Sequence, residues 1–297
     1  MKVVGGRASQ VLASRVAAAL DCELLPCEFR SFPDGELYTR IDATTLDGEP
    51  VAIVQSLTSD TDFVCLLQLI EACEGLNASK ISVVIPYLGY ARQDRRFRSG
   101  EPISVRALTR CIFADEVFVV NPHSPEALKY FENARSVEAL DAAPLLGEHF
   151  RKTKSVELVV APDDGAAALA ATVAGHAGVG YDVLEKTRLS AEEVEIKPKT
   201  LDVAGRSVAL VDDIISTGGT IVKATSLLKE LGASEVHVAC VHAVLVPGAA
   251  TRMLNAGVKE VVATDTLETI FSKVSVAELI ARRLADAATT TTTTTSK

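Results

Sequence analysis

Short apolar segments alternate with helix-like segments along nearly the whole chain, and this alternation limits the possible folds more than any other feature. The expected strands cover residues 2–4, 51–55, 80–86, 116–120, 157–161, 181–184, 207–211, 235–242 and 260–263. The expected helices cover residues 9–20, 60–76, 104–113, 142–149, 166–174, 221–231 and 276–287. Such alternation gives parallel sheets covered by helices on both faces, with ligands at the carboxyl ends of the strands. We therefore predict an α/β fold made of two similar doubly wound parallel-sheet domains.

The length of the chain fits two domains, because 297 residues of which 48% are hydrophobic can bury a large core. We place the join in a polar stretch near residues 140–153, which gives an N-terminal domain of residues 1–141 and a C-terminal domain of residues 142–287. Residues 288–297 are rich in threonine and unpatterned, so we expect a disordered tail.

Charge and composition exclude several classes of protein. The net charge of −9 argues against a nucleic-acid-binding surface. No apolar run reaches the ~18 residues of a membrane span, and the first residues lack a signal-peptide pattern. The six cysteines form no C-x-x-C pair and are expected to be reduced thiols. We expect a cytoplasmic protein without nucleic-acid or membrane partners.

A strand, two acids and a glycine-rich turn follow one another before the helix expected at residues 221–231. The strand leads into Asp212 and Asp213, and the turn consists of Ser216, Thr217, Gly218, Gly219 and Thr220. A glycine-rich turn at a helix start gathers free N–H groups and the positive end of the helix dipole, which suits a phosphate. Carboxylates beside it would repel phosphate, so they are expected to accept hydrogen bonds from sugar hydroxyls or to help hold a metal ion.

This segment resembles the motif that binds 5-phosphoribosyl 1-diphosphate in type I phosphoribosyltransferases and in ribose-phosphate pyrophosphokinases. The resemblance implies the type I phosphoribosyltransferase-like fold. It also implies that the whole segment, from Asp212 and Asp213 to Thr220, binds ribose 5-phosphate. The alternative from the residues alone is an ordinary turn between a strand and a helix.

A second segment carries four arginines within seven residues, from Arg92 to Arg98. Guanidinium groups suit polyphosphates, although a solvated basic loop has the same composition. The sequence YARQDR, followed by GEPIS, resembles the ATP-binding loop of ribose-phosphate pyrophosphokinases, which implies that Arg92, Gln93 and Arg96 contact ATP. Phosphoribosyltransferases have no reason to carry this segment.

A third segment contains the tight-turn sequence Pro33-Asp34-Gly35, which alone would be read as a surface turn. It is similar to the F-x-D-x-E segment of the pyrophosphokinases, in which the loop reaches across a subunit interface. The similarity implies that Phe32, Asp34 and Glu36 serve ATP bound by a neighbouring chain, so that a homo-oligomer is expected with a dimer as the minimal active unit.

Four further side chains follow predicted strands. His123 and Asp163 are isolated, and each alone is more often structural; the resemblance implies that they hold Mg²⁺ on the ATP phosphates. The family commonly has D-L-H where this chain has Asn121-Pro-His123, so an acidic neighbour is missing. Lys186 and Arg188 fit a solvated loop, and the resemblance implies that they are catalytic groups in a flexible loop.

These segments occur in the order that the ribose-phosphate pyrophosphokinases show, and Ser216 makes the chain more similar to archaeal members. The resemblance implies a transferase of the kinase type that converts ATP and ribose 5-phosphate to AMP and 5-phosphoribosyl 1-diphosphate (PRPP) for nucleotide biosynthesis. Two alternatives remain at this point, a phosphoribosyltransferase that uses PRPP and a non-catalytic regulatory subunit.

Overall fold

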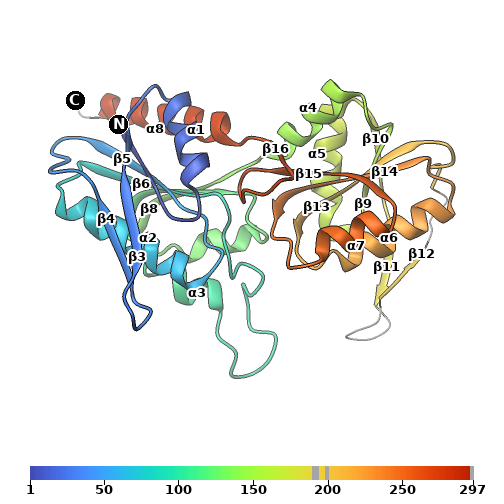
Figure 1. Ribbon diagram of the computed structural model, residues 1–297, viewed down its shortest axis with the longest axis horizontal. Helices are drawn as coiled ribbons and strands as arrows, with labels where there is room; N and C mark the ends of the chain where they lie inside the picture. The colour runs from blue at the N-terminus through green and yellow to red at the C-terminus, as the bar shows by residue number, and fades with distance from the viewer. Residues whose placement is uncertain (189–193, 198–200, 295–297) are drawn as a thin grey trace. The chain divides into compact units, whose positions relative to one another are not determined.

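The computed structural model describes residues 1–188, 194–197 and 201–294, with the backbone alone at 185–188, 194–197 and 290–294 (Figure 1). The chain forms two compact units. One consists of Met1–Asp141 with Val276–Lys297, and the other of Ala142–Ser275.

The first unit is a six-stranded parallel sheet in the order β2-β1-β5-β6-β7-β8. Its strands are β1 (Lys2–Gly5), β2 (Leu24–Leu25), β5 (Pro50–Val54), β6 (Lys80–Ile85), β7 (Ala114–Val120) and β8 (Ala134–Leu140). Its helices are α1 (Gln10–Ala19), α2 (Asp60–Gly75), α3 (Ser104–Thr109), the 3-10 helix η1 (Pro125–Tyr130) and α8 (Ala277–Thr294). An antiparallel hairpin, β3 (Cys27–Ser31) and β4 (Leu37–Ile41), leaves the sheet after β2. The central strands are buried on both faces, as parallel strands between two helix layers must be.

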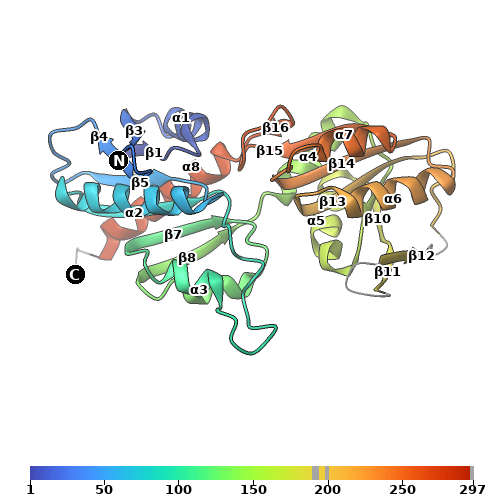
Figure 2. The same cartoon turned by 60° about the horizontal axis from the view of Figure 1, so that its bottom comes forward.

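The second unit repeats this plan, with the strand order β10-β9-β13-β14-β15-β16 and all pairings in the sheet parallel. Its strands are β9 (Leu158–Ala161), β10 (Gly180–Val183), β13 (Ser207–Ile215), β14 (Glu235–Ala243), β15 (Val258–Thr264) and β16 (Ser272–Val274). Helices α4 (Ala143–Thr153) and α5 (Ala167–Ala177) pack together on one face, and α6 (Gly219–Glu230) and α7 (Ala249–Asn255) on the other (Figure 2). A hairpin, β11 (Glu185–Arg188) and β12 (Val194–Lys197), again follows the second strand. The prediction of two similar doubly wound parallel-sheet domains is confirmed.

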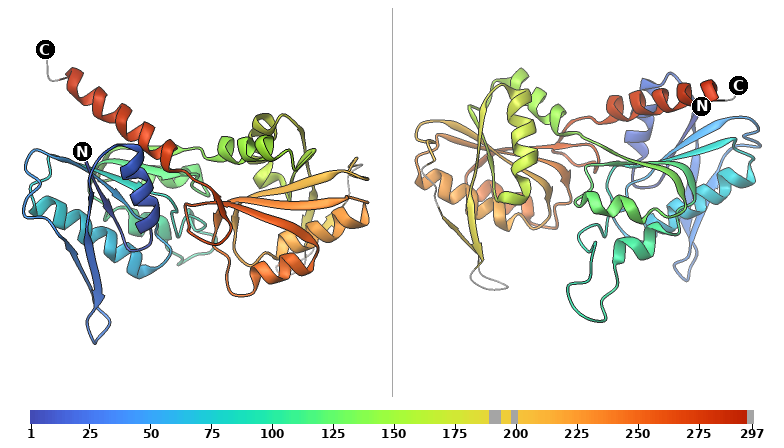
Figure 3. Two further views of the ribbon diagram at one scale, coloured as in Figure 1. Left: turned by 45° about the horizontal axis from the view of Figure 1, so that its top comes forward. Right: turned by 180° about the vertical axis from the view of Figure 1, so that it is seen from behind.

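The end of the chain differs from the prediction. Helix α8 was expected in the C-terminal domain, but it belongs to the first unit, where it packs beside α1 (Figure 3). Ile280 and Leu284 are buried there, and Arg283 pairs with Glu138 of β8 at 2.7 Å. Residues 288–294, the described part of the tail expected to be disordered, continue α8 to Thr294, whereas residues 295–297 lie outside the described part of the chain. A docked helix extends at little further cost once its first turns are fixed.

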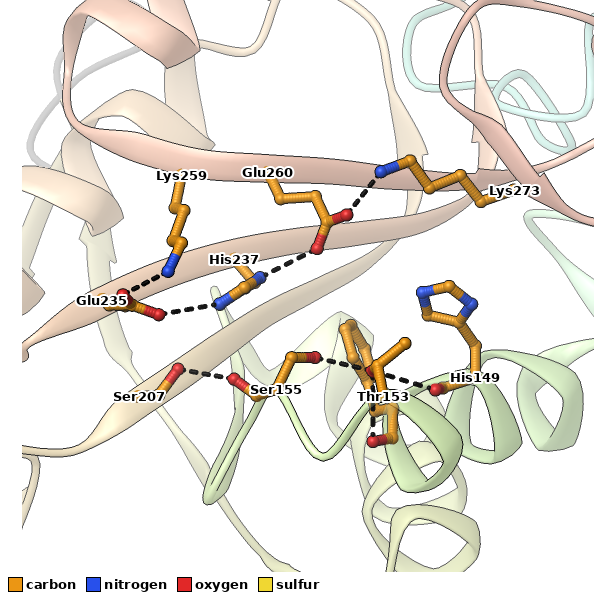
Figure 4. Close-up of polar contacts among 10 residues, drawn as sticks. His149, Thr153, Ser155, Ser207, Glu235, His237, Lys259, Glu260 and Lys273 are labelled. Atoms are coloured by element: carbon orange, nitrogen blue, oxygen red, sulfur yellow. Dashed lines mark hydrogen bonds and ion pairs between the residues drawn. The ribbon is translucent and has the colours of Figure 1, made fainter.

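Charged side chains tie together three strands of the second sheet (Figure 4). His237 is almost fully buried between two carboxylates, with its Nδ1 atom 3.1 Å from Glu260 and its Nε2 atom 3.5 Å from Glu235. Lys259 and Lys273 pair with the outer oxygens of Glu235 and Glu260. Glu235 and His237 lie near the start of β14, so this network occupies the edge opposite the strand ends that carry the candidate site.

All six cysteines are free thiols. Within the described ranges, none of the helices combines the length and the apolar character required to cross a membrane.

Candidate functional site

The glycine-rich turn lies directly between the end of β13 and the start of α6. Gly218 caps the helix with φ 75° and ψ 2°, a left-handed conformation that side chains disfavour. A Cβ atom at Gly218 would also lie 3.2 Å from Cγ of Met253. Gly219 donates its N–H to Oγ1 of Thr217 at 3.4 Å, and Thr217 is exposed. The predicted turn and the helix after it are therefore present; the positive φ expected for both glycines is found at Gly218, whereas Gly219 is the first residue of the twelve-residue helix.

Three carboxylates gather at the carboxyl ends of the neighbouring strands β9 and β13. Burial, together with the negative charges of Asp213 and Asp163, raises the pKa of Asp212 to about 8. The backbone N–H of Asp213 donates to Asp212 Oδ1 at 2.9 Å, and the N–H of Ile214 donates to Asp213 Oδ1 at 2.8 Å. Carboxylate oxygens in such a cluster can accept hydrogen bonds from hydroxyl groups or bind a cation.

Asp163 stands at the start of the short 3-10 helix η2 (Asp164–Ala166), where its Oδ1 accepts the N–H of Gly165 at 3.0 Å. The other predicted Mg²⁺ ligand, His123, is an exposed residue of the first unit that follows β7. Asn121 of the same segment has φ 35° and donates its side-chain amide to Asp141 at 2.9 Å. In the part of the chain that the structure describes, no three His, Cys, Asp or Glu side chains form a ready metal site.

The predicted catalytic residues Lys186 and Arg188 lie on β11, opposite Ile196 and Val194 of β12. Their backbone forms a hairpin, and their side chains lie outside the described part of the structure. Their assigned role stays a prediction.

The arginine segment of the first unit begins with a close contact between two chain segments. Gly89 approaches Leu57 so closely that a Cβ atom would lie 2.2 Å from the Leu57 carbonyl oxygen. Tyr90 follows with φ 62°, and its hydroxyl bonds to Asp60 at the start of α2. The side-chain oxygen of Gln93 accepts a hydrogen bond from Ser104. These contacts fix the base of the loop.

Glu101 organises the outer part of this loop, a role that the sequence analysis missed. Its Oε2 atom accepts the backbone N–H groups of Phe97 and Arg98 at 2.9 and 3.0 Å, and its carbonyl accepts Nε of Arg96 at 3.0 Å. The only sequence signal was a carboxylate three residues beyond Arg98. Arg92 is exposed and has no hydrogen-bond or ion-pair partner among the described residues. The loop thus presents guanidinium groups on a backbone that is already ordered.

The hairpin β3–β4 carries the remaining predicted ATP residues on its turn. Phe32 and Glu36 close the turn through a backbone hydrogen bond of 2.8 Å, and Gly35 adopts φ 97°. Asp34 Oδ1 accepts the N–H of Glu36 at 3.3 Å. Half of the surface of Phe32 is exposed, and its ring meets Tyr38 edge-on at 6.1 Å. An exposed phenyl ring on a short rigid turn can stack on a planar group from outside the unit.

Known proteins match the chain over both units. Residues 1–115 match the N-terminal domain of ribose phosphate pyrophosphokinase, and residues 135–279 match the phosphoribosyl transferase domain. A ribose-phosphate pyrophosphokinase of Methanosarcina mazei is 53% identical over 286 residues, which cover 96% of this chain and 95% of the relative. One of Methanosarcina acetivorans is 54% identical and covers 96% of this chain and 99% of the relative.

A solved structure also resembles the whole chain. The phosphoribosylpyrophosphate synthetase from Mycobacterium smegmatis superimposes with a TM-score of 0.83 at 31% identity, and the match covers 97% of this chain and 99% of the other.

Proposed function

The chain belongs to the ribose-phosphate pyrophosphokinase family, and from this we infer that it transfers the β,γ-diphosphoryl group of ATP to the anomeric hydroxyl of ribose 5-phosphate, giving AMP and PRPP. The observation that carries this function is the similarity over 96% of the chain, which includes the unit that holds the arginine loop. A phosphoribosyltransferase needs only the second unit. A non-catalytic relative would be expected to lose the catalytic loop, but Lys186 and Arg188 are present.

We propose that the second unit binds ribose 5-phosphate. The turn from Ser216 to Thr220 takes the 5-phosphate, because its N–H groups and the α6 dipole favour an anion. Asp212 and Asp213 accept hydrogen bonds from the ring hydroxyls, which fixes the orientation of the sugar. A hydroxyl donor also relieves the crowding of negative charge that raises the pKa of Asp212.

ATP is proposed to bind the first unit through Arg92, Gln93 and Arg96. The hydrogen bonds around Glu101 support this assignment, because a pre-ordered loop loses little conformational entropy when it binds a polyphosphate. Phe32, Asp34 and Glu36 lie on an exposed hairpin turn. We propose that they serve the ATP of a neighbouring chain, which makes a dimer the minimal active unit.

Mg²⁺ is proposed as the cofactor, with Asp163 and His123 as its protein ligands. Carboxylate oxygens are the ligands that Mg²⁺ prefers, and it keeps several waters, so few protein ligands suffice. Asp163, Asp212 and Asp213 repel one another, and a cation relieves that repulsion. When bound, the ion would neutralise charge on the phosphates of ATP.

In this diphosphoryl transfer the protein contributes substrate positioning and charge stabilisation rather than a covalent intermediate. The anomeric hydroxyl attacks the β-phosphorus in line, and AMP leaves. Lys186 and Arg188 are proposed to stabilise the charge that develops between the β-phosphorus and the leaving AMP, and closure of their hairpin would exclude water. A cytoplasmic location is proposed because free thiols are typical of a reducing compartment.

The test is incubation with ATP, Mg²⁺ and ribose 5-phosphate, followed by chromatography of the nucleotides and an enzymatic assay for PRPP. AMP and PRPP should appear in equal amounts, and chelation of Mg²⁺ by EDTA should stop both. PRPP consumption with a purine or pyrimidine base, without use of ATP, would show a phosphoribosyltransferase instead.

A further inference from the structure

Three consecutive carbonyl groups, the last of β13 and the first two of the glycine-rich turn, are all bonded from the same segment of the chain, which runs from the end of β14 into α7. The N–H of Leu245 donates to the Ile215 carbonyl at 3.0 Å, and the N–H of Val246 donates to the Ser216 carbonyl at 3.1 Å. Nη2 of Arg252 donates to the Thr217 carbonyl at 2.8 Å. The turn is therefore held from behind at three successive peptide groups.

This arrangement determines where the N–H groups of the turn point. No peptide bond in the described chain is cis, and in a planar trans peptide the C=O and the next N–H point in opposite directions. The N–H groups of Ser216, Thr217 and Gly218 therefore point away from the segment that bonds the carbonyls. None of the three has an acceptor among the described residues. They form a row of unpaired donors at the start of α6, as an anion requires.

Arg252 is the only one of these three donors that bonds through its side chain. Its hydrogen bond is therefore the one that a substitution can remove. Its guanidinium lies against Gly248, where a Cβ atom would be 2.9 Å from Nη1. Gly248 has φ 80° and begins α7, so a glycine there provides both the turn and the space. In the described part of the chain Arg252 has no carboxylate partner, and its positive charge stays uncompensated behind the turn.

We propose that Arg252 is a positioning residue for the 5-phosphate of ribose 5-phosphate. It fixes the peptide between Thr217 and Gly218 with its N–H toward the anion, and it adds positive charge from the far side of the turn. This inference rests on the proposed function, in which the turn binds that phosphate. It adds a residue of α7 that the sequence motif does not contain.

The experiment measures the dissociation constant of ribose 5-phosphate by calorimetry, together with KM for both substrates and kcat, on the full chain. Arg252→Met should raise that dissociation constant about 10- to 100-fold, as expected for a lost hydrogen bond from a charged donor. KM for ATP should change less than about twofold. Arg252→Lys keeps a cationic donor and should recover part of the affinity.

Lys229→Met is the matched control, because Lys229, which is half-buried, is also a cation that donates to a backbone carbonyl, that of Ser234 at 2.8 Å. Its substrate affinities should equal those of the unmodified chain. Thr220→Val separates this inference from the proposed function. If it weakens ribose 5-phosphate binding while Arg252→Met does not, Arg252 has no positioning role.

Two other results are also decisive. If both Thr220→Val and Arg252→Met leave the affinity unchanged, the turn is not the phosphate site, and the proposed function loses its sugar site. If Arg252→Met weakens ATP and ribose 5-phosphate equally, or if Arg252→Lys recovers nothing, the effect is a general structural one and the inference is overturned. The calorimetric stoichiometry reports the folded fraction of each variant.

Discussion

Substitution of Gly218 by alanine should weaken the fold slightly and ribose 5-phosphate binding strongly. Gly218 has φ 75°, and a left-handed conformation costs a residue with a Cβ atom about 1–2 kcal/mol. Alanine restricts the unfolded chain, which offsets about 0.4–1 kcal/mol. The net loss of stability is therefore roughly 1 kcal/mol. The new Cβ atom would also lie 3.2 Å from Cγ of Met253, which is too close. Either the Met253 side chain or the turn must therefore shift by a few tenths of an ångström.

Gly178 provides a matched control for the backbone effect. It ends α5 with φ 77°, nearly the same as Gly218, and nothing lies within 4 Å of its missing Cβ atom. Gly178→Ala should lose about the same 1 kcal/mol of stability, because only the conformational cost applies. It should leave both substrate affinities unchanged, because Gly178 lies at the end of α5 and is not one of the proposed site residues.

The assay is urea-induced unfolding of both variants, followed by calorimetric titration with ribose 5-phosphate. The two variants should show similar free energies of unfolding, while only Gly218→Ala should lose affinity, by about tenfold or more. Equal affinity in the two variants would refute the assignment of the turn as the phosphate site. A loss of stability in Gly218→Ala alone would show that the contact with Met253, not the backbone conformation, decides the cost.

Three further predictions concern titration and catalysis. The raised pKa of Asp212, about 8, means that the folded chain holds a proton which the unfolded chain releases near pH 4, so stability should fall from pH 4 to pH 8 in thermal melts. Asp212→Asn should flatten that slope; identical slopes would contradict the shift. The hydrogen bond from Lys273 lowers the pKa of Glu260 from its usual 4.5, so Glu260→Gln should lower Tm at pH 7, and this difference should shrink as the pH falls below 4.5, with kcat unchanged. A constant difference in Tm across pH would reject this role. Lys186→Ala should lower kcat by about 10²–10³-fold in steady-state assays and leave ribose 5-phosphate affinity intact; an unchanged kcat would refute the role of the loop.

The sequence predicted the central strands of both sheets because these strands are continuously apolar. Val208–Val211 and the segment around Ile53 are short apolar runs, and each is followed by a helical pattern, so each is read as a buried strand. β8 was missed because it alternates charged and small residues, as in Arg135 and Glu138, and lies at the sheet edge where one face stays accessible. Helix α7 was missed because a segment of seven residues is too short to show a clear helical pattern of apolar residues.

The position of α8 could not be predicted, because it depends on contacts between residues that lie far apart in the chain. The pairing of Arg283 with Glu138 joins residues 145 positions apart. The site residues of the glycine-rich turn were predictable because they are consecutive. Arg252 and Glu101 were not, since each acts by bonding backbone groups, and any donor or acceptor at the right place could do so.

The most direct measurement is ³¹P nuclear magnetic resonance of the reaction of ribose 5-phosphate with ATP that carries ¹⁸O in the non-bridging oxygens of its β-phosphoryl group. The account predicts that the labelled β-phosphorus moves with the γ-phosphorus to the anomeric oxygen, so that PRPP carries the label and AMP carries none. Formation of ADP and ribose 1,5-bisphosphate would show transfer of the γ-phosphoryl group alone. That result would contradict the proposed reaction.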